Sequence, residues 1–470
     1  MQSSGVAFGT SGARGLVVNM TDEVCVAYVT AFLKVMCNAF KFTRVAVGMD
    51  LRPSSPAIAE ACANAIRLAG LQVDFCGALP TPALALYAQQ QGIPAIMVTG
   101  SHIPFDRNGI KFYRPDGEIS KADESAMMAL QVALLKERVS ENLPTINTEA
   151  LVAYEQRYLD FFPVGILAGL KLGLYEHSSV ARDCFRRILE QLGAEVISLD
   201  RAEHFVPIDT EAVSAEDSRR GLAWSKQYGL DAIISTDGDG DRPLISDEQG
   251  VWLRGDIVGL LCARYLGIKG LAVPVSCNTA IELSGLFETV IRTRIGSPYV
   301  IEGMEQLAGN GSSIAGFEAN GGFLAGRGIV RNDKILEALP TRDAVLPVLA
   351  ILAAAKEQRV AVSSLLMDLP KRYTASDRIQ NFPTATSKQL LDNWRQDPRQ
   401  LCGLLDVEMG KPILVDNLDG LRITFENTEI VHLRGSGNAP ELRCYCETTS
   451  SERSSELTQR LLSYILELVK

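Results

Sequence analysis

The chain has 470 residues, of which 47% are hydrophobic and 22% are charged. This length exceeds that of a typical single domain several-fold, and the composition excludes wholesale disorder, so several domains with sizeable cores are expected. Forty-six Lys and Arg residues against fifty-six Asp and Glu residues give a formal net charge of −10. Such a charge offers no general attraction to nucleic acids or anionic membranes, so an anionic ligand needs a local basic site.

The cysteines and apolar runs indicate the compartment. Ten cysteines are scattered from Cys25 to Cys446 without a C-x-x-C pair, and the first residues carry no signal-peptide pattern. Apolar runs such as residues 344–355 are shorter than the roughly 20 residues that span a bilayer. We expect a cytoplasmic protein with no membrane partner and no nucleic-acid partner; the oligomeric state stays open.

One order of elements occurs three times along the chain. A β-branched strand at residues 43–49 precedes apolar residues at helical spacing and a second strand at 71–76. The same strand, helix and strand recur at 170–175, 180–192 and 195–199, and again at 270–276, 280–286 and 289–294. This alternation predicts α/β sheets covered by helices.

Each copy continues with a second helix, an apolar strand and a polar, glycine-rich loop. The helices are expected at 83–91, 218–228 and 299–308, and the strands at 95–98, 231–234 and 312–315. The loops that follow read TGSHIP, STDGDGDR and GFEANGG. Since ligand sites in such sheets gather beyond the carboxyl ends of strands, we expect the three loops to face one cleft.

After Pro370 the pattern changes to extended runs at 421–425, 429–433 and 442–448, followed by an amphipathic helix at 456–468. This order predicts a separate, mostly antiparallel α+β domain. The expected fold is three tandem α/β mixed-sheet domains plus a C-terminal α+β domain around a central cleft. The expected boundaries are 1–147, 148–250, 251–368 and 369–470.

The loop of Asp237, Asp239 and Asp241 places three carboxylates at alternate positions with glycines between them. Hard oxygen ligands suit Mg²⁺ or Ca²⁺. With Glu248 the spacing approaches that of an EF-hand, but Arg242 stands where the sixth-position glycine belongs and the loop follows a strand. An incomplete acidic site with open positions fits Mg²⁺ that also contacts a phosphate oxygen.

Ser101 ends an apolar strand beside His102. The G-x-S-x-G pattern of esterases is not matched, because Thr99 and Ile103 replace its glycines. Downstream, Lys111 could return to the serine as a proton carrier. Taken singly, a capping or ordinary turn serine and a solvated lysine explain these residues about equally well.

Three other glycine-rich segments carry charged or amide side chains. Residues 8–15 contain Arg14, and no G-K-[ST] follows, so they are not a P-loop. The loop at 316–322 offers an acceptor carboxylate and an amide to sugar hydroxyls, although a plain turn explains it equally well alone. Residues 434–443 join two guanidiniums to a hydroxyl and exposed N–H groups, a pattern typical of anion binding.

The order of these motifs resembles that of the α-D-phosphohexomutases across all four expected domains. The shared motifs are a glycine–arginine loop, T-x-S-H-x-P, D-G-D-G-D-R, a glutamate loop and R-x-S-G-x-x-P-x-x-R. The resemblance implies that Ser101 carries a phosphoryl group and that three aspartates bind Mg²⁺ together with that phosphate. The implied residues are Asp237, Asp239 and Asp241 at the metal; Arg14, Arg242, His102 and Lys111 around the transfer; Glu318 and Asn320 at sugar hydroxyls; and Arg434, Ser436, Asn438 and Arg443 at the non-reacting phosphate.

Three loops depart from the usual family pattern. Gly100 and Ile103 replace the Ala and Asn of T-A-S-H-N-P. In the sugar loop G-E-x-S-G-H, the residues Phe317, Asn320 and Gly322 replace Gly, Ser and His, and in the phosphate loop Asn438 and Ala439 replace Thr and Glu. The serine, carboxylates and arginines survive, so phosphoryl transfer is not threatened and the choice of sugar stays open.

The resemblance implies an isomerase that acts on hexose phosphates. We expect it to interconvert mannose 6-phosphate and mannose 1-phosphate through a phosphoserine and a hexose 1,6-bisphosphate. The same reaction on glucose phosphates is the close alternative. A Ca²⁺-binding or sugar-phosphate-sensing protein without turnover, and a metal-dependent phosphatase, are the alternatives from other classes.

Overall fold

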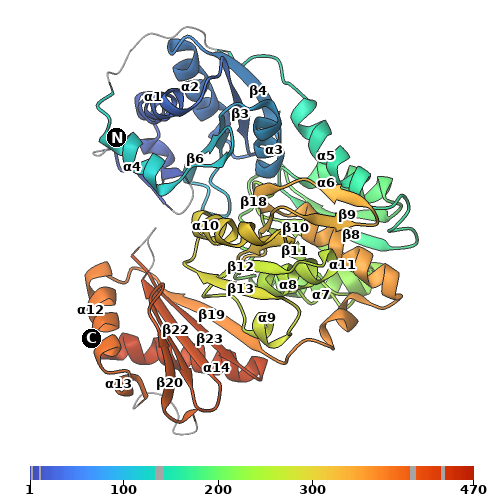
Figure 1. Ribbon diagram of the computed structural model, residues 1–470, viewed down its shortest axis with the longest axis vertical. Helices are drawn as coiled ribbons and strands as arrows, with labels where there is room; N and C mark the ends of the chain where they lie inside the picture. The colour runs from blue at the N-terminus through green and yellow to red at the C-terminus, as the bar shows by residue number, and fades with distance from the viewer. Residues whose placement is uncertain (2–3, 10–11, 133–141, 403–408, 436–439, 470) are drawn as a thin grey trace.

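A computed structural model describes residues 1, 4–9, 12–132, 142–402, 409–435 and 440–469 of the chain. Three mixed sheets with helices follow one another, and a fourth, antiparallel sheet forms the C-terminal domain. In Figure 1 the first domain (blue) lies at the top and the C-terminal domain (orange to red) at the lower left, with the second and third domains between them and to the right. The predicted fold class is confirmed.

The first domain is built on a seven-stranded sheet of order β1-β2-β6-β5-β3-β4, with β7 on β6. Its strands are β1 (Ala7–Phe8), β2 (Ala13–Leu16), β3 (Arg44–Met49), β4 (Gln72–Ala78), β5 (Ala95–Val98), β6 (Arg107–Arg114) and β7 (Gly117–Glu118). Its helices are the 3₁₀ turn η1 (Val17–Asn19), α1 (Asp22–Ala39), α2 (Ser55–Leu68), α3 (Thr81–Gln91) and α4 (Lys121–Ala129).

The second domain has a four-stranded sheet of order β11-β10-β8-β9. Its elements are α5 (Glu149–Phe161), β8 (Lys171–His177), α6 (Arg182–Gln191), β9 (Glu195–Arg201), α7 (Ala215–Tyr228), β10 (Ala232–Thr236) and β11 (Pro243–Ile245). Helix α5 contacts both α3 and α6, and so connects the first two domains (Figure 1).

The third domain has a five-stranded sheet of order β13-β12-β14-β15-β18 and a separate hairpin. The helices are α8 (Gly255–Leu266), α9 (Ala280–Leu283), α10 (Ser297–Leu307), η2 (Ala308–Asn310), α11 (Val345–Gln358) and η3 (Val362–Leu366). The strands are β12 (Gly270–Pro274), β13 (Thr289–Thr293), β14 (Ile314–Phe317), β15 (Phe323–Ala325), β18 (Leu339–Asp343) and the hairpin β16 (Ile329–Arg331) and β17 (Lys334–Leu336).

The three α/β domains share one arrangement. In each, three parallel strands are followed by an antiparallel neighbour: β6 beside β5, β11 beside β10, and β15 beside β14. Each loop between these two strands is one of the three polar loops of the sequence. We call them the serine loop (residues 99–106), the acidic loop (residues 237–242) and the glutamate loop (residues 318–322).

Glycines end several helices where the chain must turn. Gly92, Gly229 and Gly267 follow α3, α7 and α8 with φ of 63°, 62° and 65°, in the left-handed region that favours glycine. Each of these turns leads into the parallel strand that comes next in the chain. The glycines therefore allow the short helix-to-strand connections that the repeat requires.

The C-terminal domain carries a five-stranded antiparallel sheet of order β19-β23-β22-β21-β20. Its elements are β19 (Tyr373–Ile379), α12 (Thr384–Gln396), α13 (Arg399–Cys402), β20 (Pro412–Asp416), β21 (Leu421–Phe425), β22 (Ile430–Gly435), β23 (Leu442–Thr448) and α14 (Ser451–Leu468). Helix α14 begins earlier than predicted because the side chain of Ser450 caps it by accepting from the Arg453 amide.

Two kinds of core hold the molecule together. One continuous cluster of buried side chains includes Leu84 of the first domain, Ile188 of the second and Leu349 of the third. The C-terminal domain has a core of its own, which includes Leu421 and Leu461. Apolar burial contributes about 25 cal/mol per Å², so the first three domains are joined by the same force that folds them.

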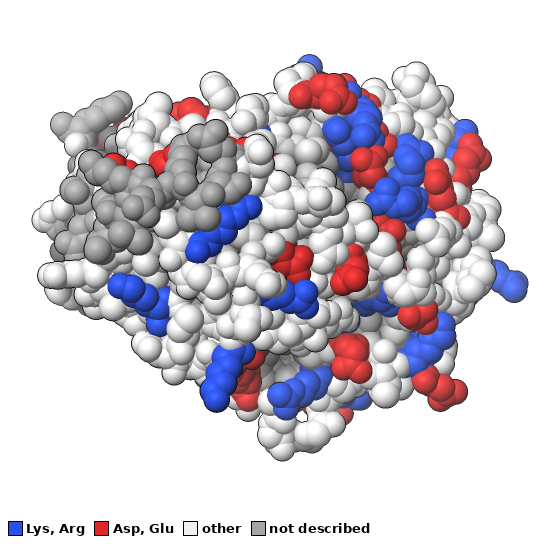
Figure 2. Space-filling view, turned by 90° about the horizontal axis from the view of Figure 1, so that it is seen from above, with Lys and Arg blue, Asp and Glu red and all other residues white. Residues whose placement is uncertain are grey.

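The surface carries mixed charge. Lys and Arg side chains lie beside Asp and Glu side chains on the face shown in Figure 2. Ion pairs account for part of this pattern; in the second domain, for example, the buried Glu176 carboxylate accepts from both Arg186 and Arg201. None of the helices that the structure describes is both long and apolar enough to cross a membrane.

Candidate active site

The serine loop places Ser101 next to the acidic loop of the second domain. Ser101 is buried and has φ of 52°, a left-handed conformation that is uncommon for a residue with a side chain. Its hydroxyl donates a hydrogen bond of 2.6 Å to Asp237 Oδ2. The predicted serine and the predicted metal-binding carboxylates are therefore in direct contact.

A buried arginine holds the backbone of the serine loop. The Arg52 guanidinium donates to four carbonyl oxygens: those of Ser101 (2.8 Å), Ile103 (2.6 Å), Pro104 (2.8 Å) and Arg107 (2.9 Å). A Cβ atom at Gly100 would lie only 2.5 Å from Arg52 Cζ. Arg52 thus explains why glycine replaces the family's usual alanine at this position.

Asp50 completes this support. Its Oδ1 accepts from the Ser55 hydroxyl at 2.5 Å, and its Oδ2 accepts from the Thr99 hydroxyl at 2.8 Å. The Arg52 guanidinium also lies 4.0 Å from the ring centroid of Phe205 in the second domain. Sequence reasoning missed Asp50 and Arg52; the one available signal was a charged pair directly after the end of β3.

The acidic loop uses one set of carboxylate oxygens to stay folded. Asp237 Oδ1 accepts from the Asp241 and Arg242 amides at 3.2 Å each. Asp239 Oδ2 accepts from the Thr81 hydroxyl at the start of α3 and from Lys111 Nζ, both at 2.6 Å. Asp241 Oδ2 accepts from Lys111 Nζ at 2.7 Å. The loop is therefore fixed against the first domain.

The remaining oxygens fit a hard cation. Asp237, Asp239 and Asp241 are fully buried, and one ligand atom of each lies within 4.8 Å of the others. Asp239 Oδ1 and Asp241 Oδ1 accept no hydrogen bond from any part of the chain that the structure describes. Buried carboxylate oxygens without donors are costly unless a cation binds them. The donor set is all oxygen, which suits Mg²⁺.

The electrostatics of the three carboxylates point the same way. Burial and the charges of Asp239 and Asp241 raise the pKa of Asp237 well above its usual value. Although burial raises the pKa of Asp239, the ammonium of Lys111 lowers it below the ordinary range. The surroundings thus favour the charged form of Asp239 and disfavour that of Asp237, beside Ser101, where a bound cation would favour it.

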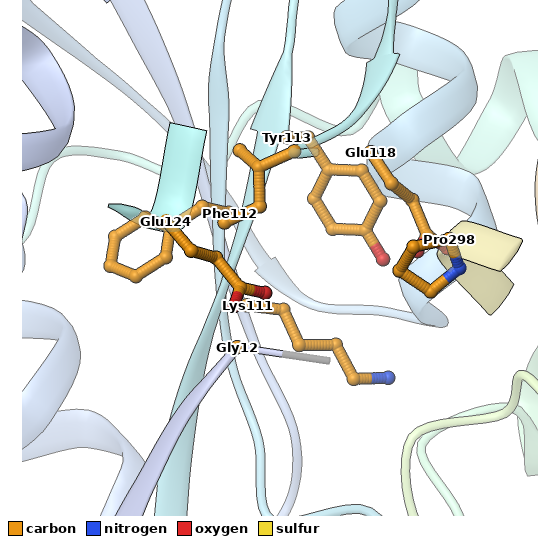
Figure 3. A pocket seen from close by; sticks show the side chains of 8 residues that line it. Gly12, Lys111, Phe112, Tyr113, Glu118, Glu124 and Pro298 are labelled. Carbon is orange, nitrogen blue, oxygen red and sulfur yellow. The ribbon is translucent and has the colours of Figure 1, made fainter. Parts of the chain in front are cut away.

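Lys111 reaches this site from β6. Figure 3 shows its side chain extending past Gly12, while Tyr113 and Glu118 are directed toward Pro298 at the start of α10. Residues 111 and 113 share one face of β6 because side chains alternate along a strand. Glu118 accepts from the Thr341 hydroxyl at 2.7 Å, which ties the first domain to the third.

His102 is held as a neutral ring. Its Nδ1 accepts from Arg242 Nη1 at 2.8 Å and lies 3.3 Å from Ser101 Oγ. Burial and the neighbouring charges of Arg242, Arg14 and Arg443 lower the pKa of His102 well below its usual value. At neutral pH the imidazole is therefore an acceptor beside the serine hydroxyl.

Arginines gather around the serine and the aspartates. Loss of solvent contact, together with the charges of Arg242 and Arg342, lowers the pKa of Arg14 to about 10. Like charges placed this close are stabilised by an anion, and a phosphoryl group on Ser101 would supply one. The structure thus brings the predicted Arg14 and Arg242 to the predicted serine.

The glutamate loop approaches from the third domain. Glu318 is buried, and its Oε2 accepts from Arg342 Nη1 at 3.0 Å. Arg342 lies on β18 and also donates from Nε to Asp241 Oδ2 at 3.1 Å. Asn320 uses its side-chain oxygen to accept from the Gly322 amide at 3.0 Å, and so stabilises its own loop. Sequence reasoning missed Arg342, which follows no motif.

The predicted phosphate loop of the C-terminal domain lies partly outside the described residues. Ser436 and Asn438 belong to the portion that is not described. Arg434 forms an ion pair of 2.8 Å with Asp419, and Arg443 an ion pair of 3.4 Å with Glu441, both within the domain. The charge of Arg443 is one of those that lower the pKa of His102.

Comparisons with known proteins agree with this architecture. Family models described as phosphoglucomutase/phosphomannomutase alpha/beta/alpha domains I, II and III match residues 5–133, 160–250 and 254–373. A phosphomannomutase from Salmonella muenchen is 49% identical over 465 residues, which is 99% of this chain and 96% of the relative. A phosphomannomutase from Sinorhizobium fredii is 44% identical over 470 residues, covering 98% of this chain and 99% of the relative.

A solved structure shows the same fold. The crystal structure of a provisionally assigned phosphomannomutase from Thermus thermophilus matches with a TM-score of 0.77 at 21% identity, covering 98% of this chain and 99% of that one. The structural match shows the fold alone, whereas the full-length sequence matches show common descent. The chain belongs to the phosphoglucomutase/phosphomannomutase family.

Proposed function

We propose that the chain is an isomerase that interconverts mannose 6-phosphate and mannose 1-phosphate through a phosphoserine at Ser101. The observation that carries this proposal is the 2.6 Å contact between Ser101 Oγ and Asp237 Oδ2, inside a buried set of three carboxylates. The two relatives described above, at 49% and 44% identity, are phosphomannomutases and support the choice of sugar.

The charges of the site support a phosphoserine with a divalent cation. The carboxylates of Asp237, Asp239, Asp241 and Glu318 face the four cationic groups Lys111, Arg14, Arg242 and Arg342. A phosphoryl group and Mg²⁺ carry nearly equal and opposite charges, so both can enter together without unbalancing the site. Asp237, Asp239 and Asp241 would hold the cation.

In the forward step, the free hydroxyl of the hexose phosphate attacks the phosphorus of phosphoserine 101. A new sugar O–P bond forms, the Oγ–P bond breaks, and its electron pair stays on Ser101 Oγ. Lys111 gives a proton to Ser101 Oγ and regains one from the attacking hydroxyl, so the lysine ends the step as it began. The product is a hexose 1,6-bisphosphate.

The return step uses the other phosphate of the same intermediate. The bisphosphate turns over in the site, and Ser101 Oγ attacks the second phosphorus, with the bond changes and the proton path reversed. Arg14 and Arg242 stabilise charge on the transferring group, and Mg²⁺, when bound, stabilises the charge on its oxygens. Ser101 is left phosphorylated for the next cycle.

Recognition of the rest of the substrate is assigned to two other regions. Glu318 and Asn320 would accept and donate hydrogen bonds to sugar hydroxyls from the glutamate loop. The phosphate that is not transferred would be held by charged hydrogen bonds. The residues that would donate them are Arg434, Ser436, Asn438 and Arg443. A central cleft and the four-domain division at 1–147, 148–250, 251–368 and 369–470 are part of this proposal.

We further propose that the partners are small hexose phosphates and that the compartment is a reducing cytoplasm. The nine cysteines whose side chains the structure describes are free thiols, and most of them are buried. Burial raises the pKa of Cys62 and Cys184 well above the usual value, so they would be poor nucleophiles. These thiols fit structural rather than redox roles.

The proposal is tested by assaying isomerisation of mannose 1-phosphate, glucose 1-phosphate and glucosamine 1-phosphate side by side, with Mg²⁺ and a catalytic amount of glucose 1,6-bisphosphate. Mannose 6-phosphate should form fastest, without net release of inorganic phosphate. Faster conversion of glucose 1-phosphate would make the chain a phosphoglucomutase with the same mechanism. Stoichiometric release of inorganic phosphate would indicate a phosphatase. No turnover with any of the three sugars would indicate a protein that binds sugar phosphates without converting them.

A further inference from the structure

Arg342 lies between two loops that come from different domains. Its side chain is only 3% exposed. Nε and Nη2 each lie 3.1 Å from Asp241 Oδ2 in the acidic loop, and Nη1 donates to Glu318 Oε2 at 3.0 Å. One planar guanidinium therefore links a proposed metal-binding carboxylate to a proposed sugar-binding carboxylate.

The backbone of the glutamate loop is shaped around this side chain. A Cβ atom at Gly322 would lie 2.6 Å from Arg342 Cδ, 2.7 Å from Cγ and 3.0 Å from Cβ. These atoms belong to the stem of the side chain, which cannot swing away without moving the strand. Arg342 thus fills the space that a side chain at position 322 would need, where the family pattern has histidine.

The bond from Arg342 fixes the orientation of the Glu318 carboxylate and also pairs its negative charge. Loop residues have freedom to move, and an acceptor for sugar hydroxyls is useful only if it is held in place. The acidic loop is itself bonded to Lys111 and Thr81 of the first domain. Because Arg342 bonds both Asp241 and Glu318, it holds the Glu318 carboxylate in a fixed orientation relative to the acidic loop, where the phosphoryl group would be transferred.

We propose that Arg342 is a positioning residue for sugar recognition: it holds the Glu318 carboxylate at a fixed place relative to the acidic loop. This inference rests on the proposed function. Its consequence is selective, since the loss of Arg342 should weaken contacts to the sugar ring more than contacts to a phosphate group. A lysine at this position has a single charged point and cannot bridge both carboxylates with a planar fork.

The test measures binding and does not depend on turnover. In a Ser101→Ala background with Mg²⁺, titration calorimetry gives the Kd of mannose 1-phosphate and of inorganic phosphate. Arg342→Met should weaken mannose 1-phosphate by about tenfold to a hundredfold, the range for a hydrogen bond to a charged group. Inorganic phosphate should change by less than about threefold, because it offers no sugar hydroxyls.

Further variants separate this role from a general loss of structure. Glu318→Gln should weaken mannose 1-phosphate binding to a similar extent. The double variant should be no worse than either single one, because both changes disable the same contact between Glu318 and the sugar. Arg342→Lys should recover only part of the affinity. Arg331→Met is the matched control: it removes an arginine that is ion-paired with Glu357 in the same domain, and it should leave both Kd values unchanged.

Four results would overturn the inference. Equal weakening of mannose 1-phosphate and inorganic phosphate would make Arg342 a phosphate ligand instead. Fully additive losses in the double variant would separate Arg342 from Glu318, and an unchanged Kd in Arg342→Met would remove the residue from recognition. A parent protein that binds inorganic phosphate but not mannose 1-phosphate would refute the proposed substrate itself, and this role with it.

Discussion

The loops that would transfer phosphate and the loop that would anchor it are built differently. The serine, acidic and glutamate loops belong to domains that share one core, and side-chain bonds join them across domain borders, as in Ser101 to Asp237 and Arg342 to Asp241. The C-terminal domain has a separate core, and its Arg434 is paired within the domain. The loops that would transfer phosphate are therefore preorganised, whereas the proposed anchor belongs to a body with a core of its own.

A small polar cluster connects this body to the third domain. Glu447 on β23 accepts from Arg372 Nε at 2.6 Å and also from the Thr279 hydroxyl. Asn278 donates to the Arg372 carbonyl and to the Thr374 hydroxyl, both at 3.0 Å. A second bond joins the two bodies at another place, where the Ile295 amide donates to Asp419 Oδ2 at 2.9 Å. These connections are directional bonds, in contrast to the apolar core that joins the other three domains.

The largest effect is expected from Ser101→Ala, which removes the group that would carry the phosphoryl. Turnover should fall by roughly a thousandfold or more, as for loss of an enzymic nucleophile. Intact mass should lose a species about 80 Da heavier than the bare chain. Wild-type activity in this variant would place the transfer outside the serine loop.

Asp239→Asn tests the cation. The change removes one buried ligand charge and disturbs the pair with Lys111, so turnover should fall by about a hundredfold or more. Chelation of the wild type should stop turnover, and added Mg²⁺ should restore it. Full activity after chelation, or activity with Ca²⁺ and none with Mg²⁺, would contradict the assignment.

Gly100→Ala tests the rigidity of the serine loop. The new methyl group would lie 2.5 Å from Arg52 Cζ, so the guanidinium must shift and release carbonyls that it now holds. A displacement of about 1 Å in a site can cost a hundredfold in rate, and we expect a loss of that order in kcat with little change in KM. Gly309→Ala, where a Cβ atom meets nothing within 4 Å, is the control. Equal effects of the two variants would show that Arg52 does not constrain the loop.

Arg434→Ala tests the anchor. Catalytic efficiency should fall by about tenfold to a hundredfold, the value of one charged hydrogen bond. Phosphorylation of Ser101 should survive, because that loop lies in another domain. Arg399→Ala removes an exposed ion pair with Asp397 in the same domain and should have no effect. If Arg434→Ala and Arg443→Ala both leave KM unchanged, the anchor lies elsewhere.

The smallest effect on activity is expected from core substitutions. They test whether the C-terminal domain unfolds independently of the other three domains. Leu461→Ala and Leu349→Ala each empty a buried site and should each cost about 2–5 kcal/mol of unfolding free energy. Calorimetry should show that Leu461→Ala lowers only the unfolding transition of the C-terminal domain. A single transition that shifts equally in both variants would mean that the four domains unfold as one unit.

Sequence patterns predicted the repeated architecture because its signals are local. Strands such as β5 and β10 are short apolar runs that end in polar, glycine-rich loops, and glycine marks the ends of helices such as α3. The loop order also predicted which segments would meet. Ser101, the three aspartates, Lys111, His102 and the two arginines do lie together, while their proposed roles stay predictions.

The residues that sequence reasoning missed are those whose importance depends on distant partners. Arg52 and Arg342 follow no motif, and each acts on a loop that lies some distance away in the chain. The sequence nevertheless carries an indirect sign of both arginines. Gly100 and Gly322 depart from the family pattern at the two positions where these arginines leave no room for a Cβ atom. Only the three-dimensional contact reveals why glycine stands there.

The central claim, transfer of a phosphoryl group between Ser101 and a hexose, is tested most directly by following that group. Protein labelled at Ser101 by incubation with ³²P-labelled glucose 1,6-bisphosphate is mixed with excess unlabelled mannose 1-phosphate and Mg²⁺ for a single turnover. We predict that the label leaves Ser101 and appears in mannose phosphates, while inorganic phosphate stays at background. Label that appears in inorganic phosphate, or protein that never takes up label at Ser101, would contradict the claim.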